Sequence, residues 1–178
     1  MSSEIMSLEM DVFCLLLLIR ILYQMYINRE QNDHWNYFYY TIAWACVYLF
    51  MDAIWIMNVK HFLTFSKIQS GIFNSFYFCS LAMLVCSWYV YVQKTLHSAV
   101  LKHKKILVLT FIPLIFFIGS SLLSYWTHGL FVIDQAGNYH RGKLLPFYFL
   151  ILFAYILYLS IKAGYLSKKA KNYLYQKE

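Results

Sequence analysis

The sequence predicts an all-α membrane protein, a bundle of five transmembrane helices, from its composition and from the way its apolar residues are grouped. Of the 178 residues, 61% are apolar and 13% are charged, whereas soluble domains average about 25% charged residues. The apolar residues come in blocks. A soluble catalytic domain needs about 100 residues or more of mixed polarity, and no segment between the blocks approaches that length. The composition therefore excludes a soluble enzyme.

Five of these blocks are long enough to cross a bilayer, which takes about 20 residues in a helix. They are residues 11–27, 37–57, 70–92, 106–126 and 144–161. On this basis we expect three regions. Residues 1–10 form an extracellular N-terminal tail, residues 11–162 form the transmembrane bundle, and residues 163–178 form a basic cytoplasmic tail.

The distribution of basic residues predicts an N-outside, C-inside orientation. In this orientation ten Lys and Arg residues lie in inner segments and four in outer segments, and cytoplasmic loops carry an excess of such residues. The ten are Arg29, Lys94, Lys102, Lys104, Lys105, Lys162, Lys168, Lys169, Lys171 and Lys177, and the four are Lys60, Lys67, Arg141 and Lys143. Attraction to membrane lipid headgroups also accounts for the net charge of +7, so we expect no nucleic-acid partner.

Two ionisable residues, Arg20 and Asp52, fall inside predicted spans, where a charge at the helix centre costs about 2.5 to 3.5 kcal/mol. Their axial offset is roughly 6 Å at 1.5 Å per residue, which a long arginine side chain can bridge. An intramembrane polar pair of Arg20 and Asp52 is therefore one hypothesis. The alternatives are that Arg20 extends to the inner headgroups, and that Asp52 is either hydrogen-bonded between helices or part of a ligand or proton site.

Several polar and aromatic residues are predicted to lie at the same outer level as Asp52, where they outline a cup that opens outward. They are Trp55 in the second span, Asn74 and Tyr77 in the third, and Ser120, Ser121 and Ser124 in the fourth. Close packing of helices through small residues is the alternative explanation for the serines.

The segment between the fourth and fifth spans, residues 127–143, is predicted to form a short extracellular β-hairpin-like loop. A strand-like run at 130–133 precedes turn residues, among them Asp134 and Gly137, and residues 139–141 follow. Such a loop would cover the cup with Tyr139, His140 and Arg141. A connecting loop without a further role is the alternative.

No metal, cofactor or catalytic site is predicted. None of the six histidines lies in a predicted span, and their spacing fits no metal-binding motif. The four cysteines all lie in apolar blocks, where cysteine usually packs as a small hydrophobic residue. We therefore expect no enzymatic activity from this chain.

Several short motifs resemble the multi-helix membrane sensory (input) region of bacterial GGDEF-type diguanylate cyclases, over roughly residues 10 to 165. The motifs are Phe131-x-Ile133-Asp134, Gly137-Asn138-x-His140-Arg141-Gly142, the segment 52–55, and Asn74 followed by Trp88-x-x-Tyr91. The resemblance implies a sensory module in the bacterial cytoplasmic membrane. It also implies a homodimer and a cytoplasmic output domain that makes cyclic di-GMP from two GTP.

The sequence departs from that family in two respects. It contains no GGDEF signature and no phosphate-binding loop, and Lys143 stands where the family's loop usually has proline. We therefore expect either a truncated or split sensor, or a stand-alone member that acts through a partner.

The predicted function is a sensor that binds an unknown small ligand from the outside and relays the signal to a cytoplasmic output. The predicted ligand-binding residues are Asp52, Trp55, Asn74, Tyr77, Ser120, Ser124, Tyr139, His140 and Arg141. The alternative is a small transporter or channel subunit with an Asp52/Arg20 polar path, although five spans cannot be divided into the two equal repeats common in transporters. A structural or anchoring protein is the third class.

Overall fold

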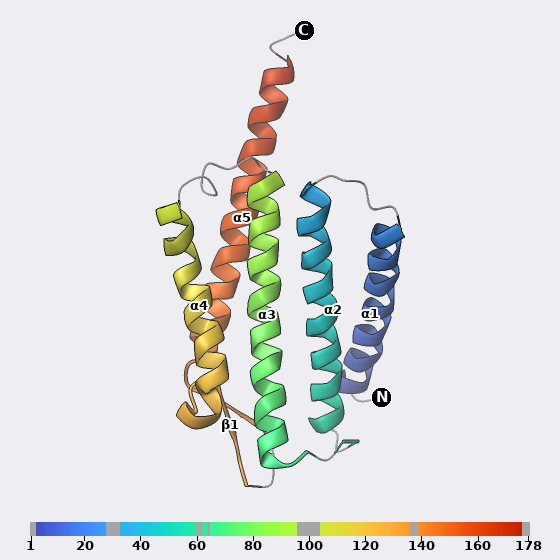
Figure 1. The fold of residues 1–178 in the computed structure, drawn as a ribbon, viewed down its shortest axis with the longest axis vertical. Coiled ribbons are helices and arrows are strands. Elements are labelled where there is room, and N and C mark those ends of the chain that lie inside the picture. Colours follow the sequence, from blue (N-terminus) through green and yellow to red (C-terminus); the bar gives the residue numbers. More distant parts are fainter. Residues whose placement is uncertain are drawn as a thin grey trace.

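The structure is a computed structural model that describes residues 3–27, 33–59, 62–63, 65–95, 104–135 and 139–175. Five helices and two short strands make up this part of the chain (Figure 1). In chain order they are α1 (Ser3–Ile27), α2 (Asp33–Val59), α3 (Lys67–Thr95), α4 (Lys104–Thr127), β1 (Phe131–Ile133), β2 (Tyr139–Arg141) and α5 (Leu145–Tyr175).

Four to five of these helices are long and apolar enough to cross a membrane. Four apolar stretches have at least the required length, and a shorter one of 17 residues lies in α4. The four are Leu8–Ile27, Asn36–Asn58, Lys67–Thr95 and Leu145–Lys162, and the shorter one is Phe111–Thr127. The prediction of a mostly helical chain with apolar, membrane-length helices is confirmed at this level.

Helix α3 is the central helix of the bundle, since it contacts α2, α4 and α5, while α1 packs against α2 (Figure 1). Its start differs from the predicted Ser70 because a capping box precedes it. The Ser66 backbone N–H donates to Gln69 Oε1 at 3.0 Å, and the Gln69 N–H donates to Ser66 Oγ at 3.4 Å. This reciprocal arrangement satisfies N–H groups that a helix start leaves unpaired, so α3 begins at Lys67.

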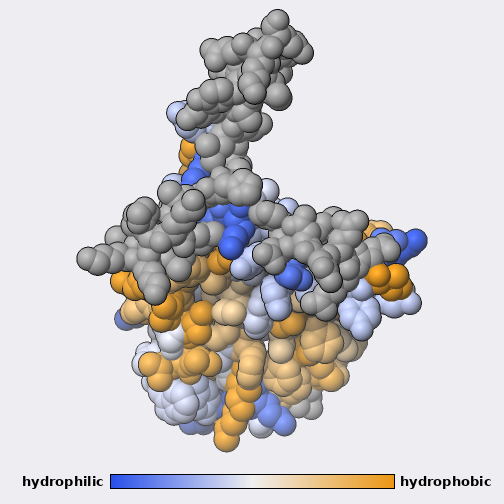
Figure 2. Space-filling view, turned by 45° about the horizontal axis from the view of Figure 1, so that its top comes forward, coloured by the Kyte–Doolittle hydropathy of each residue, from blue (hydrophilic) through white to orange (hydrophobic). Residues whose placement is uncertain are grey.

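The hydrophobic core is formed by buried residues of α3, α4, β1 and α5. Its members are Phe78, Val85, Leu114, Phe117, Leu130, Phe131, Ile133, Leu145, Tyr148 and Leu152. Within it the Tyr148 hydroxyl donates to the Phe78 carbonyl oxygen at 2.5 Å, which ties α5 to α3. Many large apolar side chains, such as Leu16, Phe116 and Leu150, are instead exposed on the outer faces, and Figure 2 shows such residues along the visible flank of the bundle.

The two strands form an antiparallel ladder, with Phe131 opposite Arg141 and Ile133 opposite Tyr139. The Gly142 N–H donates to the Leu130 carbonyl oxygen at 2.8 Å, next to the end of the ladder. We call the end of the bundle that carries these strands the hairpin end. Only residues 142–144 separate β2 from α5, so the hairpin is joined almost directly to the last helix.

At the opposite end of the bundle, α3 and α5 are joined by a polar contact. Lys162 Nζ donates to Oε1 of the buried Gln93 at 2.6 Å. Helix α5 then continues past the other helices to Tyr175 (Figure 1). The predicted basic tail, residues 163–178, therefore begins as a continuation of the last helix, and its lysine side chains lie outside the described residues.

Candidate ligand-binding site

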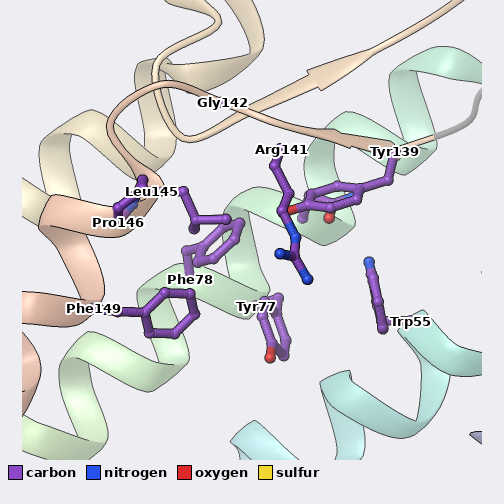
Figure 3. A pocket seen from close by; sticks show the side chains of 10 residues that line it. Trp55, Tyr77, Phe78, Tyr139, Arg141, Gly142, Leu145, Pro146 and Phe149 are labelled. Atoms are coloured by element: carbon purple, nitrogen blue, oxygen red, sulfur yellow. The ribbon is translucent and has the colours of Figure 1, made fainter.

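A cavity of about 430 Å³ lies at the hairpin end, between α2, α3, β2 and the start of α5 (Figure 3). Small-molecule sites typically measure about 300 to 1,000 Å³, so the volume suits a small ligand. The wall consists of Trp55, Asn74, Tyr77, Phe78, Tyr139, Arg141, Gly142, Leu145, Pro146 and Phe149. Side chains from segments far apart in the sequence thus meet around one space.

Five of the nine predicted ligand-binding residues line this cavity: Trp55, Asn74, Tyr77, Tyr139 and Arg141. They come from α2, α3 and β2, and they meet because α2 and α3 run antiparallel and the hairpin folds over their ends. The predicted grouping of the second span, the third span and the loop is therefore present in the structure.

An aromatic group joins α2, α3 and the hairpin on one side of the cavity. The Trp55 and Tyr77 rings stack with their centroids 6.4 Å apart, and Trp55 meets the Tyr139 ring edge-on at 5.7 Å. The Tyr77 hydroxyl forms a hydrogen bond of 3.2 Å with the Tyr48 hydroxyl on α2. These contacts, typical of aromatic pairs, hold the wall in shape without a ligand.

Arg141 supplies positive charge to the cavity. It is the only charged side chain among the described residues that line the wall, and Figure 3 shows its guanidinium group extending from β2 toward Trp55 and Tyr77. Burial raises the pKa of the neighbouring Tyr139 hydroxyl above its ordinary value, and the positive charge of Arg141 acts in the opposite direction on that pKa. The guanidinium is therefore close enough to act electrostatically within the cavity.

Asn74 brings an unsatisfied polar atom to the cavity wall. Its side chain is only 2% exposed. Its Nδ2 donates to the Ser70 carbonyl oxygen at 2.7 Å, whereas its Oδ1 has no hydrogen-bond partner. The reversed amide would place Oδ1 against that carbonyl oxygen, so the described orientation is the favourable one. A buried acceptor without a partner is destabilising, and a ligand that donates a hydrogen bond would satisfy it.

Replacing Asn74 with leucine is expected to leave the ligand-free protein as stable as the wild type, or to stabilise it by up to about 1 kcal/mol. The reason is that the change removes an unsatisfied polar group and keeps a similar volume. Gln93→Leu on the same helix serves as the control. It also removes an unsatisfied buried atom, Nε2, but it takes away the acceptor of the Lys162 ammonium as well, so it should cost about 1 to 3 kcal/mol. Unfolding by SDS in mixed micelles measures both changes. Equal losses in the two variants would show that the Asn74 amide is a structural group.

Asp52 lies behind the cavity wall. Its carboxyl group interacts with Tyr77, which lines the cavity, and with the carboxyl group of Asp11 on α1. Asp52 can therefore influence the cavity through Tyr77, and Asp11 is a polar neighbour that the sequence did not point to.

The structure does not bring Arg20 and Asp52 together. Arg20 is exposed, and no ion pair joins it to Asp52 in the part of the chain that the structure describes. Asp11, the residue of α1 that meets Asp52, lies nine residues before Arg20. Nine residues correspond to about 13 Å along a helix and to about half a turn around it. Arg20 is thus at another depth and on the opposite face of α1.

Ser120, Ser124 and His140 lie outside the cavity wall. Ser120 donates to the Phe117 carbonyl oxygen of its own helix at 3.0 Å. Ser124 Oγ accepts hydrogen bonds from the backbone N–H groups of Leu130 at 2.8 Å and Phe131 at 3.1 Å, so it anchors β1 on α4. His140 is exposed on the hairpin, where its Nε2 lies 3.4 Å from Asp134 Oδ2.

Five wall residues were not predicted from the sequence: Phe78, Gly142, Leu145, Pro146 and Phe149. Three of them open α5 and follow the hairpin directly. The sequence did hold a signal for these residues of α5. Only a short link follows Arg141, so the first turn of the last helix has to lie beside the loop that covers the cup. Phe78 follows Asn74 by four residues and therefore shares its helix face.

Within the described residues, no cluster of three or more His, Cys, Asp or Glu side chains could hold a metal ion. Comparisons with protein-family models, with curated proteins and with solved structures give no match to this chain. The resemblance to GGDEF-associated sensory regions therefore stays a prediction from short motifs.

Proposed function

We propose that the protein is a membrane-embedded sensory module, with its cavity open to the outside and its last helix leading to a cytoplasmic output such as a diguanylate cyclase. The proposal rests on one observation: residues of α2, α3, β2 and α5 together line the cavity. A ligand in such a cavity contacts elements that can shift relative to one another. In this proposal the N-terminus is outside, the protein lies in the bacterial cytoplasmic membrane, and it acts as a homodimer.

The proposed relay runs along α5. Three residues separate Arg141, on the cavity wall, from the start of α5. Further along α5, Lys162 bonds to Gln93 of α3. A ligand shifts such an equilibrium only if it binds one helix arrangement better than another. Contacts to Arg141 and to the Trp55–Tyr77 pair provide that difference when the hairpin moves relative to α2 and α3.

The rival function, a small transporter or channel subunit with an Asp52/Arg20 path, needs polar groups across the whole bundle. Between Asn74 and Gln93, the buried positions of α3 at helical spacing are instead occupied by Phe78, Ala82, Val85 and Tyr89. Arg20 also lies on the exposed face of α1. Both observations favour a closed-ended binding site, which a sensor uses, over a continuous path.

The test is a fusion of the chain, after Glu178, to a diguanylate cyclase domain, with cyclic di-GMP measured in cells exposed to a broad set of extracellular metabolites. We expect at least one condition to change the output severalfold in the wild type. Arg141→Ala and Asp52→Asn should abolish that change, because they remove the charge of the cavity wall and the group behind Tyr77.

Ser120→Ala is the matched control for this experiment. Among the described residues, its hydroxyl bonds only to the carbonyl oxygen of its own helix turn, so the response should persist. A wild-type response that survives unchanged in both Arg141→Ala and Asp52→Asn would refute the sensory role of the cavity.

A further inference from the structure

We propose that the ligand of this cavity is an amphipathic organic anion: an aromatic or aliphatic body that carries a carboxylate or similar anionic group and also a hydrogen-bond donor. This inference rests on the proposed function, in that it takes the cavity to be the sensory site. It follows from three independent properties of the wall: its charge, its unsatisfied polar atom and its aromatic surface.

The charge of the wall selects an anion. The guanidinium group of Arg141 offers five N–H donors in a planar fork that matches a carboxylate. No carboxylate is among the residues that line the cavity, and no ion pair of Arg141 occurs in the described part of the chain. The carboxyl group of Asp52, behind the wall, interacts with Asp11 and with Tyr77. The guanidinium is thus available to an anion that enters the cavity.

The unsatisfied atom selects a donor on the ligand. Oδ1 of Asn74 is a buried acceptor without a partner, while Nδ2 of the same amide is already used by Ser70. An anionic group cannot satisfy Oδ1, because it also only accepts hydrogen bonds. A hydroxyl or N–H group elsewhere on the ligand would do so. A site with a buried polar atom discriminates strongly against analogues that lack the matching group.

The remaining wall selects an apolar body. Four aromatic side chains surround the space: Trp55 from α2, Tyr77 and Phe78 from α3, and Phe149 from α5. Aromatic walls of this kind favour rings or acyl chains, and a cavity of about 430 Å³ has room for a fused two-ring compound. Two sources can supply this chemistry, a water-soluble aromatic acid and an anionic lipid of the surrounding bilayer.

Three probes separate these contributions: indole-3-acetate, its neutral amide indole-3-acetamide, and 1-naphthylacetate, which keeps the charge but lacks the ring N–H. Isothermal titration calorimetry of the full chain in phosphatidylcholine nanodiscs measures their affinities, and empty nanodiscs correct for partitioning. We expect indole-3-acetate to bind about tenfold or more tightly than either analogue, since each analogue lacks one charged or polar contact.

Two variants assign the contacts. Arg141→Gln should bring the acid and the amide to similar affinities, whereas Arg141→Lys should keep part of the difference. Asn74→Leu should give indole-3-acetate and 1-naphthylacetate similar affinities. Nanodiscs that contain phosphatidylglycerol separate the two sources. Weaker binding of the neutral amide as well as the acid would identify an anionic lipid as a competing ligand, because the negative membrane surface repels only the acid. Unchanged binding of the amide would favour a soluble acid.

The proposal is overturned if the amide binds as tightly as the acid, if Arg141→Gln leaves the difference intact, or if no probe binds. These outcomes are distinct from a failure of the proposed function. Tight binding of the amide would leave the cavity as a ligand site with another preference. The cyclase fusion reports separately on whether any occupant of the cavity produces a signal.

Discussion

Replacing Gly142 with alanine is expected to destabilise the protein by about 3 kcal/mol, because the added methyl group has no space. A Cβ atom at this position would come closer than 3.0 Å to backbone atoms of Gly129 and Leu130, including the Gly129 carbonyl carbon at 2.6 Å. Side chains can rotate out of such a clash, but these backbone atoms belong to the segment that pairs with residues 142–144. The hairpin would therefore have to separate from the start of α5.

Unfolding by SDS in mixed micelles measures this loss, and Gly119→Ala provides the matched control. At Gly119 in α4 a Cβ atom meets nothing within 4 Å, and alanine in a helix interior is favoured over glycine by roughly 0.5 to 1 kcal/mol. The control should be as stable as the wild type or more stable. A Gly142→Ala variant with wild-type stability would show that the described contact of 142 with 129–130 does not persist in the bilayer.

Replacing Ser124 with alanine is expected to cost about 2 to 4 kcal/mol and to release β1 from α4. The Ser124 side chain is 0% exposed, and its oxygen is the acceptor for two buried backbone N–H groups, those of Leu130 and Phe131. Each donor left unsatisfied costs about 1 to 3 kcal/mol. Faster hydrogen exchange at these two amides, measured together with the SDS unfolding midpoint, reports the change directly.

Ser121→Ala is the control for this substitution, since Ser121 is equally buried and lies one turn earlier on the same helix. Its hydroxyl donates to the Phe117 carbonyl oxygen of α4 at 2.7 Å, and that carbonyl lies in a continuous helix, where the backbone ladder also uses it. Its loss should stay below about 1 kcal/mol. Similar losses in the two variants would mean that the hairpin is not held by Ser124.

The sequence predicted the helical blocks and their order because membrane-length apolar runs are unusual in composition and sharply bounded. It did not predict where the helices end. The start of α3 depends on a hydrogen-bonded pair, Ser66 and Gln69, and α1 begins at Ser3, well before the apolar run. Such ends are set by polar contacts that hydropathy does not register.

The sequence predicted the depth in the bundle at which the site lies. It did not predict which side chains at that depth face one another. Trp55, Asn74 and Tyr77 lie together because depth in an up-and-down bundle follows from the position of a residue in its span. The pairing of Arg20 with Asp52 relied on depth alone, whereas a contact also requires the facing side of the helix. Asp11 meets both requirements. The sequence also could not distinguish Ser124, which anchors the hairpin, from Ser120. Nothing in a sequence shows whether a serine hydroxyl bonds to its own helix or to a neighbouring strand.

Because the link between β2 and α5 is short and α5 is long, a small movement of the hairpin can produce a larger displacement at the far end of α5. The helix has 31 residues and so spans about 46 Å. If it tilts as a rigid rod about its first turn, a rotation of about 5° at the cavity displaces its other end by about 4 Å. A change in the hairpin too small to open the core would thus be amplified into a displacement, beyond the bundle, comparable to the spacing of adjacent Cα atoms in a chain.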